Sequence, residues 1–192
     1  MEWLNEPAQW SSSNDRIIIN TLPKTDFWRV THYGFIRDNG HFYFDRVNTD
    51  FVVEVEIRGS YQDLYDQAGI MIRSDEHHWI KTGIEYVDGV QHLSAVVTHE
   101  YSDWSLTPLL TPLSSIRLRV ERRKEAIHIS YLDTNSKYVL LRLAYFPNTE
   151  VQVGIVCASP EGNGYEVVFD NYRLFARSAA SIEDPSTPLE TG

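Results

Sequence analysis

Residues 61–104 read YQDLYDQAGIMIRSDEHHWIKTGIEYVDGVQHLSAVVTHEYSDW, and this stretch determines the fold class. It contains three strand-like runs separated by acidic or glycine-containing turns. In each run, residues of one parity are apolar and residues of the other parity are polar or charged. Such alternation is typical of an antiparallel sheet with one face on a core and the other face in water. The sequence therefore predicts an all-β protein.

Strand-like runs continue on both sides of this block, whereas helical periodicity is hard to find. Asp38-Asn39-Gly40 and Asp88-Gly89 are hairpin signals, because glycine tolerates positive φ and Asn and Asp bond their own backbone. Lys124-Glu125 and residues 133–137 join two further pairs. Many short strands at regular spacing indicate a sandwich or a barrel. The predicted strands are residues 16–20, 27–31, 41–44, 51–58, 67–73, 79–87, 90–98, 116–122, 126–132, 138–144, 151–157 and 166–175.

The length and composition fit one globular domain. The chain has 192 residues, of which 42% are hydrophobic and 23% charged, and all-β domains of about 200 residues are common. We assign residues 1–176 to this domain. Residues 177–192 are rich in Ala, Ser, Pro, Thr and Glu, and we expect them to form a disordered tail.

Charge and segment composition exclude several classes of partner. The formal net charge is −10, which argues against general binding to nucleic acid, since that depends on clustered Lys and Arg. One basic cluster (Arg117, Arg119, Arg122, Arg123 and Lys124) is interpreted as a solvated strand edge. We do not expect the N-terminus to be a signal peptide, and no apolar run is long enough for a membrane helix. The single cysteine, Cys157, excludes an internal disulfide. We therefore expect a cytoplasmic protein without membrane contact.

The polar parity of the central strands supplies the candidate ligand-binding residues. Tryptophan rings there could stack on the apolar faces of sugars, and the charged and hydroxyl groups could bond sugar hydroxyls. The alternative is that the tryptophans belong to the core and the polar groups to an ordinary surface. We expect Arg73→Ala or Lys81→Ala to weaken ligand binding with little loss of stability. The candidates are Arg73, Trp79, Lys81, Glu85, Ser94, Thr98 and Trp104.

Gly69 and Gly83 share the parity of these polar groups. Glycine inside a strand often marks the close approach of a ligand or of another backbone. A β-bulge, or room for a large neighbour, is the alternative.

Catalytic and metal-binding patterns are weak, and we assign no catalytic or metal-binding residue. Glu54 and Glu56 share one face of a strand, as glycosidase carboxylates can, but Arg58 stands where a third acid would follow. Glu85 is interpreted as an ion-pair partner of Lys81 and not as a general acid. The adjacent histidines His77 and His78 face opposite sides of a strand and cannot chelate one ion together.

Several motifs of this chain resemble a family of unknown function in the concanavalin A-like lectin/glucanase superfamily, whose members are often labelled "regulation of enolase protein". The resemblance covers about residues 1–176. The matching motifs are Asp26-Phe27-Trp28, residues 66–73, residues 79–86, residues 93–98 with Ser102-Asp103-Trp104, Val153-Gly154-Ile155 with Ala158-Ser159-Pro160, and Val168-Phe169-Asp170-Asn171.

The resemblance implies a jelly-roll sandwich of two antiparallel sheets, one of them concave. Our leading hypothesis is a non-catalytic domain that binds a carbohydrate or a sugar-derived metabolite on the concave face. The alternative is a protein-interaction module that regulates a metabolic, glycolytic enzyme. Glycoside hydrolysis is less favoured, because the acidic pattern at Glu54 and Glu56 is incomplete and the fold alone does not fix the function. No cofactor is expected. Asp170 is the one residue considered for a structural calcium, as found in some proteins with this fold.

Overall fold

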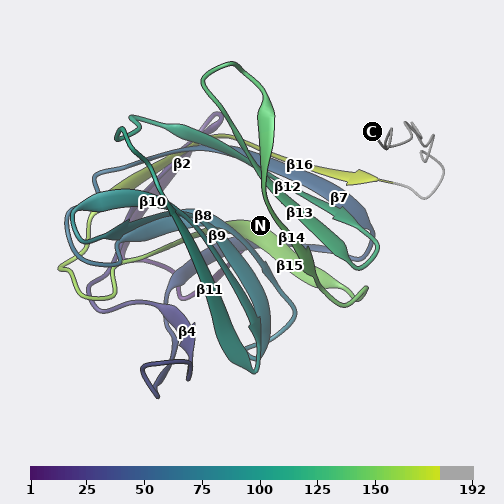
Figure 1. Ribbon diagram of the computed structural model, residues 1–192, viewed down its shortest axis with the longest axis horizontal. Coiled ribbons are helices and arrows are strands. Elements are labelled where there is room, and N and C mark those ends of the chain that lie inside the picture. The colour runs from purple at the N-terminus through teal and green to yellow at the C-terminus, as the bar shows by residue number, and fades with distance from the viewer. Residues whose placement is uncertain (178–192) are drawn as a thin grey trace, which may run out of the picture.

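Two antiparallel seven-stranded sheets pack face to face and form a jelly-roll sandwich (Figure 1). The structure is a computed structural model that describes residues 1–177. Every named element in this range is a strand. No helix of the described chain is long and apolar enough to cross a membrane. The all-β class and the jelly-roll architecture predicted from the sequence are thus confirmed.

The strands of each sheet come from distant parts of the chain. Sheet A contains, in spatial order, β1 (Glu2–Leu4), β6 (His41–Val47), β15 (Val151–Ala158), β8 (Gln67–Arg73), β9 (His78–Val87), β10 (Val90–His99) and β11 (Tyr101–Pro108). Sheet B contains β14 (Tyr138–Tyr145), β13 (Ala126–Leu132), β12 (Ile116–Arg123), β7 (Asp50–Gly59), β16 (Glu166–Arg177), β3 (Arg16–Asn20) and β2 (Gln9–Ser13). A small separate pair is formed by β4 (Phe27–Arg29) and β5 (Ile36–Asp38).

The main core lies between the two sheets and follows the predicted parity. Val53, Val55 and Ile57 of β7 are buried there, as are Ile70 and Ile72 of β8. These β-branched side chains suit a pleated surface that packs on one face. Their burial removes apolar surface from water, which is the main force that holds two sheets together.

Of the two hairpin turns predicted from Asp, Asn and Gly, one is confirmed and one is wrong. Asp88 and Gly89 join β9 to β10 with φ values of 51° and 80°, as expected for a two-residue hairpin. The prediction for Asp38-Asn39-Gly40 was wrong, because β5 pairs with β4, and β6 pairs with β1 and β15. This turn carries the chain from the small β4–β5 hairpin into sheet A. The amides of Asn39 and Gly40 both donate to the carbonyl of Asp26.

The outer, concave face of sheet A is not the solvated surface that the alternation suggested. The β4–β5 hairpin covers part of it, and a second apolar cluster fills the space between them. This cluster contains Phe27 and Trp28 of the hairpin together with Met71, Trp79 and Val96 of sheet A. The covered face therefore has a small core of its own. In Figure 1 the hairpin strand β4 lies beside the sheet, near β11.

Two further expectations concern the basic cluster and the tail. Arg122 is not solvated but fully buried, and its guanidinium donates to the carbonyls of Lys124, Pro147 and Thr149. It thereby fastens the loop after β14. Strand β16 ends at Arg177, one residue beyond the predicted domain boundary. The rest of the expected tail, residues 178–192, lies outside the described residues.

Candidate functional site

A pocket opens where the β4–β5 hairpin meets the uncovered part of the concave face. Its cavity volume is about 70 Å³, and it is partly open to solvent. It is therefore smaller than the range of about 300–1,000 Å³ typical of sites that enclose a whole small molecule. Residues from five separate segments contribute to it. The lining residues are Asp26, Trp28, Tyr33, Phe35, Arg37, Tyr65, Gln67, Lys81, Glu85, Trp104, Pro160 and Glu161.

The buried base of the pocket, which we call the polar floor, consists of Asp26, Gln67, Lys81 and Glu85. Lys81 Nζ donates to Asp26 Oδ1 at 3.1 Å and to the Phe27 carbonyl at 2.7 Å. Gln67 Nε2 donates to the same Asp26 oxygen at 3.3 Å. All four side chains are buried, so their hydrogen bonds hold them in fixed positions within a region of low polarity.

Glu85 is bound differently from Asp26. Its Oε2 accepts hydrogen bonds from Ser94 Oγ at 2.6 Å and from Trp104 Nε1 at 2.9 Å. The expected ion pair with Lys81 is not formed, because Lys81 pairs with Asp26. Burial raises the pKa of Glu85 above its ordinary value, although the positive charge of Lys81 and the two hydrogen bonds oppose this rise.

Aromatic rings form the sides of the pocket, and we call Trp28, Tyr33, Phe35, Tyr65 and Trp104 the aromatic wall. Neighbouring rings contact one another at centroid distances of 5.4–6.4 Å. The hydroxyls of Tyr33 and Tyr65 are 2.8 Å apart and hydrogen-bond to each other, which links the hairpin turn to the loop before β8. The pocket thus combines apolar sides with a few fixed polar groups.

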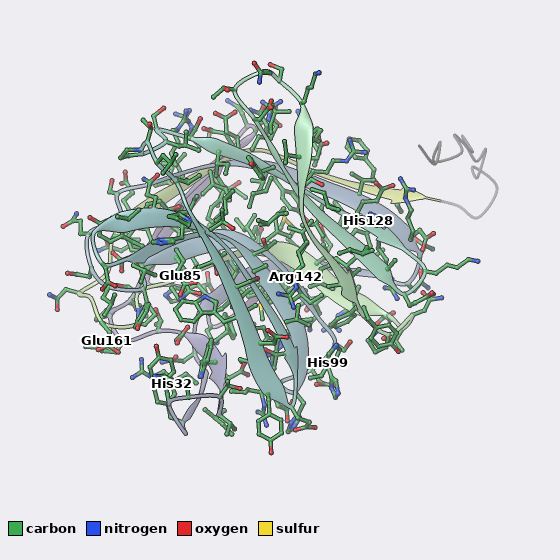
Figure 2. The ribbon with its side chains drawn as sticks, viewed as in Figure 1. His32, Glu85, His99, His128, Arg142 and Glu161 are labelled. Carbon is green, nitrogen blue, oxygen red and sulfur yellow. The ribbon has the colours of Figure 1, made fainter. Side chains whose placement is uncertain are left out.

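The structure brings only some of the predicted residues to this pocket. Lys81, Glu85 and Trp104 line it, and Ser94 lies behind Glu85 as its hydrogen-bond donor. Figure 2 shows Glu85, together with Glu161, on the side of the sandwich where the β4–β5 hairpin lies. The sequence therefore identified part of the floor and one member of the aromatic wall.

The other predicted residues lie beneath the hairpin, away from the pocket. Arg73 makes a bidentate ion pair with Asp38 of β5, at 2.7 and 2.8 Å. Trp79 is 1% exposed and packs edge-on against Phe27. Thr98 is fully buried and shares a hydrogen bond with the hydroxyl of Ser102. A ligand could reach these side chains only if the hairpin moved away.

Sequence reasoning missed most residues from the loops. Tyr33, Tyr65, Arg37 and Glu161 come from the hairpin and from two loops that reach the pocket only in the folded chain. Asp26 and Gln67 belong to motifs that carry the family resemblance. Gln67 shares the polar parity of Gly69 and Arg73 on β8 but was not among the candidates, whereas Asp26 precedes β4, where no period-two pattern applies. Trp28 belongs to the Asp26-Phe27-Trp28 motif and is not among the candidates predicted from the sequence.

The two strand glycines are explained by the sheet itself. Gly69 and Gly83 are directly opposite each other on β8 and β9. A Cβ on Gly69 would lie 1.8 Å from the Thr82 carbonyl oxygen, and one on Gly83 would lie 2.0 Å from that of Ala68. The close approach is thus between two neighbouring strands, and it gives no separate evidence for a ligand.

The alternative catalytic and metal sites do not fit the chemistry they would need. Glu54 and Glu56 face Arg119 and Arg117 at 3.6 and 3.2 Å on the outer face of sheet B. Hydrogen bonds from Ser115 and Arg117 lower the pKa of Glu56, so it is not suited to donate a proton. No group of potential metal ligands gathers anywhere within residues 1–177.

Asp170 does not offer a free carboxylate to a calcium ion. It accepts hydrogen bonds from both Arg16 and Arg58. Two guanidinium groups already neutralise the negative charge that a hard cation would need. The residues around Asp170 therefore do not fit the structural calcium considered from the sequence.

Comparison with known proteins identifies relatives along almost the whole chain. The model of the family described as "Protein of unknown function (DUF1349)" matches residues 3–176. The chain is 40% identical over 185 residues to "Regulation of enolase protein 1" of Saccharomyces cerevisiae, covering 96% of this chain and 93% of that protein.

Solved structures show the same fold. A functionally unknown protein from Saccharomyces cerevisiae superimposes with a TM-score of 0.87 at 40% identity, covering 92% of this chain and 96% of that one. A GH43 protein from Bacillus licheniformis gives a TM-score of 0.70 at 15% identity, over 90% of this chain and 36% of that one. The carbohydrate binding module CBM66 from Bacillus subtilis gives 0.54 at 13% identity, over 91% and 95%. The last two likenesses concern the fold alone.

Proposed function

Since the chain belongs to the DUF1349 family, whose function is unknown, we propose a function from the site itself: it binds a carbohydrate or a sugar-derived metabolite in the pocket beside the β4–β5 hairpin. The observation that carries this proposal is the combination of the aromatic wall with the polar floor. Sugars present apolar ring faces and rims of hydroxyls, so they need both kinds of surface. The jelly-roll fold shared with a carbohydrate binding module is consistent with this proposal.

The polar floor supplies both donors and acceptors for hydroxyl groups. Asp26 and Glu85 carry acceptor oxygens, while Lys81 and Gln67 carry N–H donors. Their mutual hydrogen bonds fix these groups before a ligand arrives, so little conformational entropy is lost on binding. Fixed polar groups at the base and apolar sides are the usual features of a small-molecule site.

A thermal-shift screen of the full chain against monosaccharides, disaccharides and sugar phosphates tests the proposal. We expect a saturable rise in Tm with one sugar class, because a ligand that binds only the folded state stabilises it. The rise should be lost in Trp104→Ala, which removes one ring of the aromatic wall. The matched control is Trp10→Ala, since Trp10 lies outside the pocket and is partly buried against the main core. The absence of a shift with every sugar would refute the proposal.

A second candidate function is control of a metabolic enzyme through protein contact. The yeast relative is named for regulation of enolase, and the edge strand β14 of this chain exposes Leu140, Leu143 and Tyr145 by 56–62%. Exposed apolar residues on an edge strand are typical of a contact surface. Size-exclusion chromatography with purified enolase tests this candidate. Co-elution that is lost in Leu143→Glu would support it, and separate elution would contradict it.

A further inference from the structure

The charges of the pocket are paired with one exception. Asp26 is paired with Lys81 at 3.1 Å, and Glu161 with Arg37 at 3.6 Å. Glu85 forms no ion pair with any lysine, arginine or histidine among residues 1–177 within 4.0 Å. It is the one acidic residue of the lining without a positive partner at contact distance.

The surroundings of Glu85 make this missing partner significant. The residue Glu85 is 6% exposed, and its two donors, Ser94 and Trp104, are both neutral and both bond Oε2. Its other oxygen, Oε1, receives no hydrogen bond from the described residues. An ionised carboxylate that is removed from water without a positive partner is unfavourable. Neutral donors therefore satisfy one oxygen of Glu85, and its other oxygen belongs to a pocket-lining carboxylate whose nearest positive charge, that of Lys81, is already paired with Asp26.

The aromatic wall adds a second preference for positive charge. The faces of Trp and Tyr rings carry negative electrostatic potential and attract cations within about 6 Å. Trp28, Tyr65 and Trp104 supply such rings around the same space, and Trp104 also bonds Glu85 directly. The net charge of −10 further favours the approach of cations over that of anions.

From these observations, and resting on the proposed function, we propose that the ligand is an amino sugar, or a sugar derivative with a protonated amino group, and that its ammonium is the counterion of Glu85. The ammonium would bond Glu85 Oε1 while the aromatic wall surrounds it. Asp26, Lys81 and Gln67 remain available for hydroxyl groups of the sugar. Sugar phosphates and other anionic derivatives are disfavoured by the same arrangement.

In the competing arrangement, the protonated carboxyl group of Glu85 donates a hydrogen bond to an oxygen of a neutral sugar. The two differ in their response to pH. An ammonium competes with a proton for Glu85, so its binding strengthens as pH rises through the titration of this carboxyl group. A neutral acceptor needs the protonated carboxyl group, so its binding weakens over the same range.

Isothermal titration calorimetry of the full chain with matched sugar pairs tests the proposal. Glucosamine is compared with glucose, and galactosamine with galactose, from about pH 4.5, the ordinary pKa of a glutamate carboxyl group, to about pH 7, where an aliphatic amine is still largely protonated. We expect at least one amino sugar to bind about tenfold or more tightly than its neutral partner, a difference of about 1.4 kcal/mol. Its affinity should rise with pH.

Two variants locate the effect. Glu85→Gln keeps an acceptor for Ser94 and Trp104 and should abolish the preference for the amino sugar. Glu161→Gln is the matched control, because it removes the same charge from the pocket rim while leaving Glu85 intact, and it should retain the preference.

Each other outcome is informative. Equal or tighter binding of the neutral sugars would overturn this inference and leave the proposed function standing. A preference that survives in Glu85→Gln would also overturn it. If no sugar of either kind binds, both the inference and the proposed function fail.

Discussion

Lys81 and Asp26 form a buried ion pair, 3.1 Å from Nζ to Oδ1, that joins the middle of β9 to the residue before β4. The same ammonium bonds the Phe27 carbonyl. This pair does two things at once, because it fastens the β4–β5 hairpin to sheet A and forms part of the base of the pocket. The hairpin and the pocket are therefore energetically linked.

Replacement of Lys81 by methionine should lower the free energy of unfolding by about 3–5 kcal/mol, because it leaves the Asp26 carboxylate buried without its partner. Urea denaturation measures the change. The double variant Asp26→Asn/Lys81→Met should recover part of the loss. Lys24→Met is the control, since Lys24 is 60% exposed, and it should change stability by no more than about 0.5 kcal/mol. An equally small change in the free energy of unfolding for Lys81→Met would contradict the conclusion that Lys81 and Asp26 form a buried ion pair.

This expectation replaces the one drawn from the sequence, in which Lys81→Ala and Arg73→Ala weaken binding with little loss of stability. Period-two alternation predicts on which face of a strand a side chain lies. It does not predict that a hairpin from a distant part of the chain will cover that face. Arg73 is buried against Asp38 for this reason, and its removal should also destabilise the protein.

Trp104→Phe should raise the pKa of Glu85 further. The phenyl ring retains most of the apolar contact but lacks the Nε1–H that donates to the carboxylate, and a lost hydrogen bond to the charged form disfavours that form. NMR titration of the Glu85 side chain measures the change. Trp10→Phe removes a similar indole–carboxylate hydrogen bond at Glu6 and should leave the titration of Glu85 unaltered. An unchanged pKa in Trp104→Phe would mean that this hydrogen bond has no electrostatic effect.

Glu85→Gln should stabilise the protein in a pH-dependent manner. The pKa of Glu85 is raised in the folded state above its ordinary value of 4.5, so the ionised carboxyl group opposes folding. Below about pH 4.5 the carboxyl group is protonated in both states, and the effect is absent. As the pH rises through the folded pKa, the wild type loses stability that the variant keeps, by about 1.4 kcal/mol for each pKa unit of the shift.

Melting temperatures of both proteins between about pH 4 and 8 test this. The gap in Tm should widen with pH in favour of Glu85→Gln, whereas Glu161→Gln should show no such trend. A gap that is constant with pH, or one that favours the wild type at high pH, would show that Glu85 is compensated in the fold.

The sequence predicts the regular part of the fold well, and it predicts the irregular part poorly. The bounds of β8 and β13 are as predicted, because both strands alternate clearly and pack on the core. Strands β2 and β11, with the sequences QWSSS and YSDWSLTP, were missed. Both are edge strands with few apolar residues, held by backbone hydrogen bonds that leave no mark on the hydrophobic pattern.

The same limit applies to the candidate site. Lys81, Glu85 and Trp104 were found because they lie at polar-parity positions or in a motif of the family. Tyr33, Tyr65 and Glu161 lie on loops, where no periodicity exists to orient a side chain. Tyr65 has a φ of 68°, a conformation that a bulky residue adopts only when tertiary contacts impose it. Its position at the pocket depends on the whole fold.

Gly69→Ala should destabilise the protein strongly, because the new methyl group would lie 1.8 Å from the Thr82 carbonyl oxygen of the neighbouring strand. The clash is with backbone near the middle of sheet A, where the strands cannot move apart without breaking hydrogen bonds. We expect a loss at or above the upper end of the range of about 1–3 kcal/mol seen for overpacked cores. Gly59→Ala is the comparison, since its methyl group would meet the end of the Tyr61 ring, a side chain, and not the backbone of a neighbouring strand. Urea denaturation of both variants measures the difference, and a loss for Gly69→Ala no larger than that for Gly59→Ala would show that β8 and β9 are less closely packed than the structure indicates.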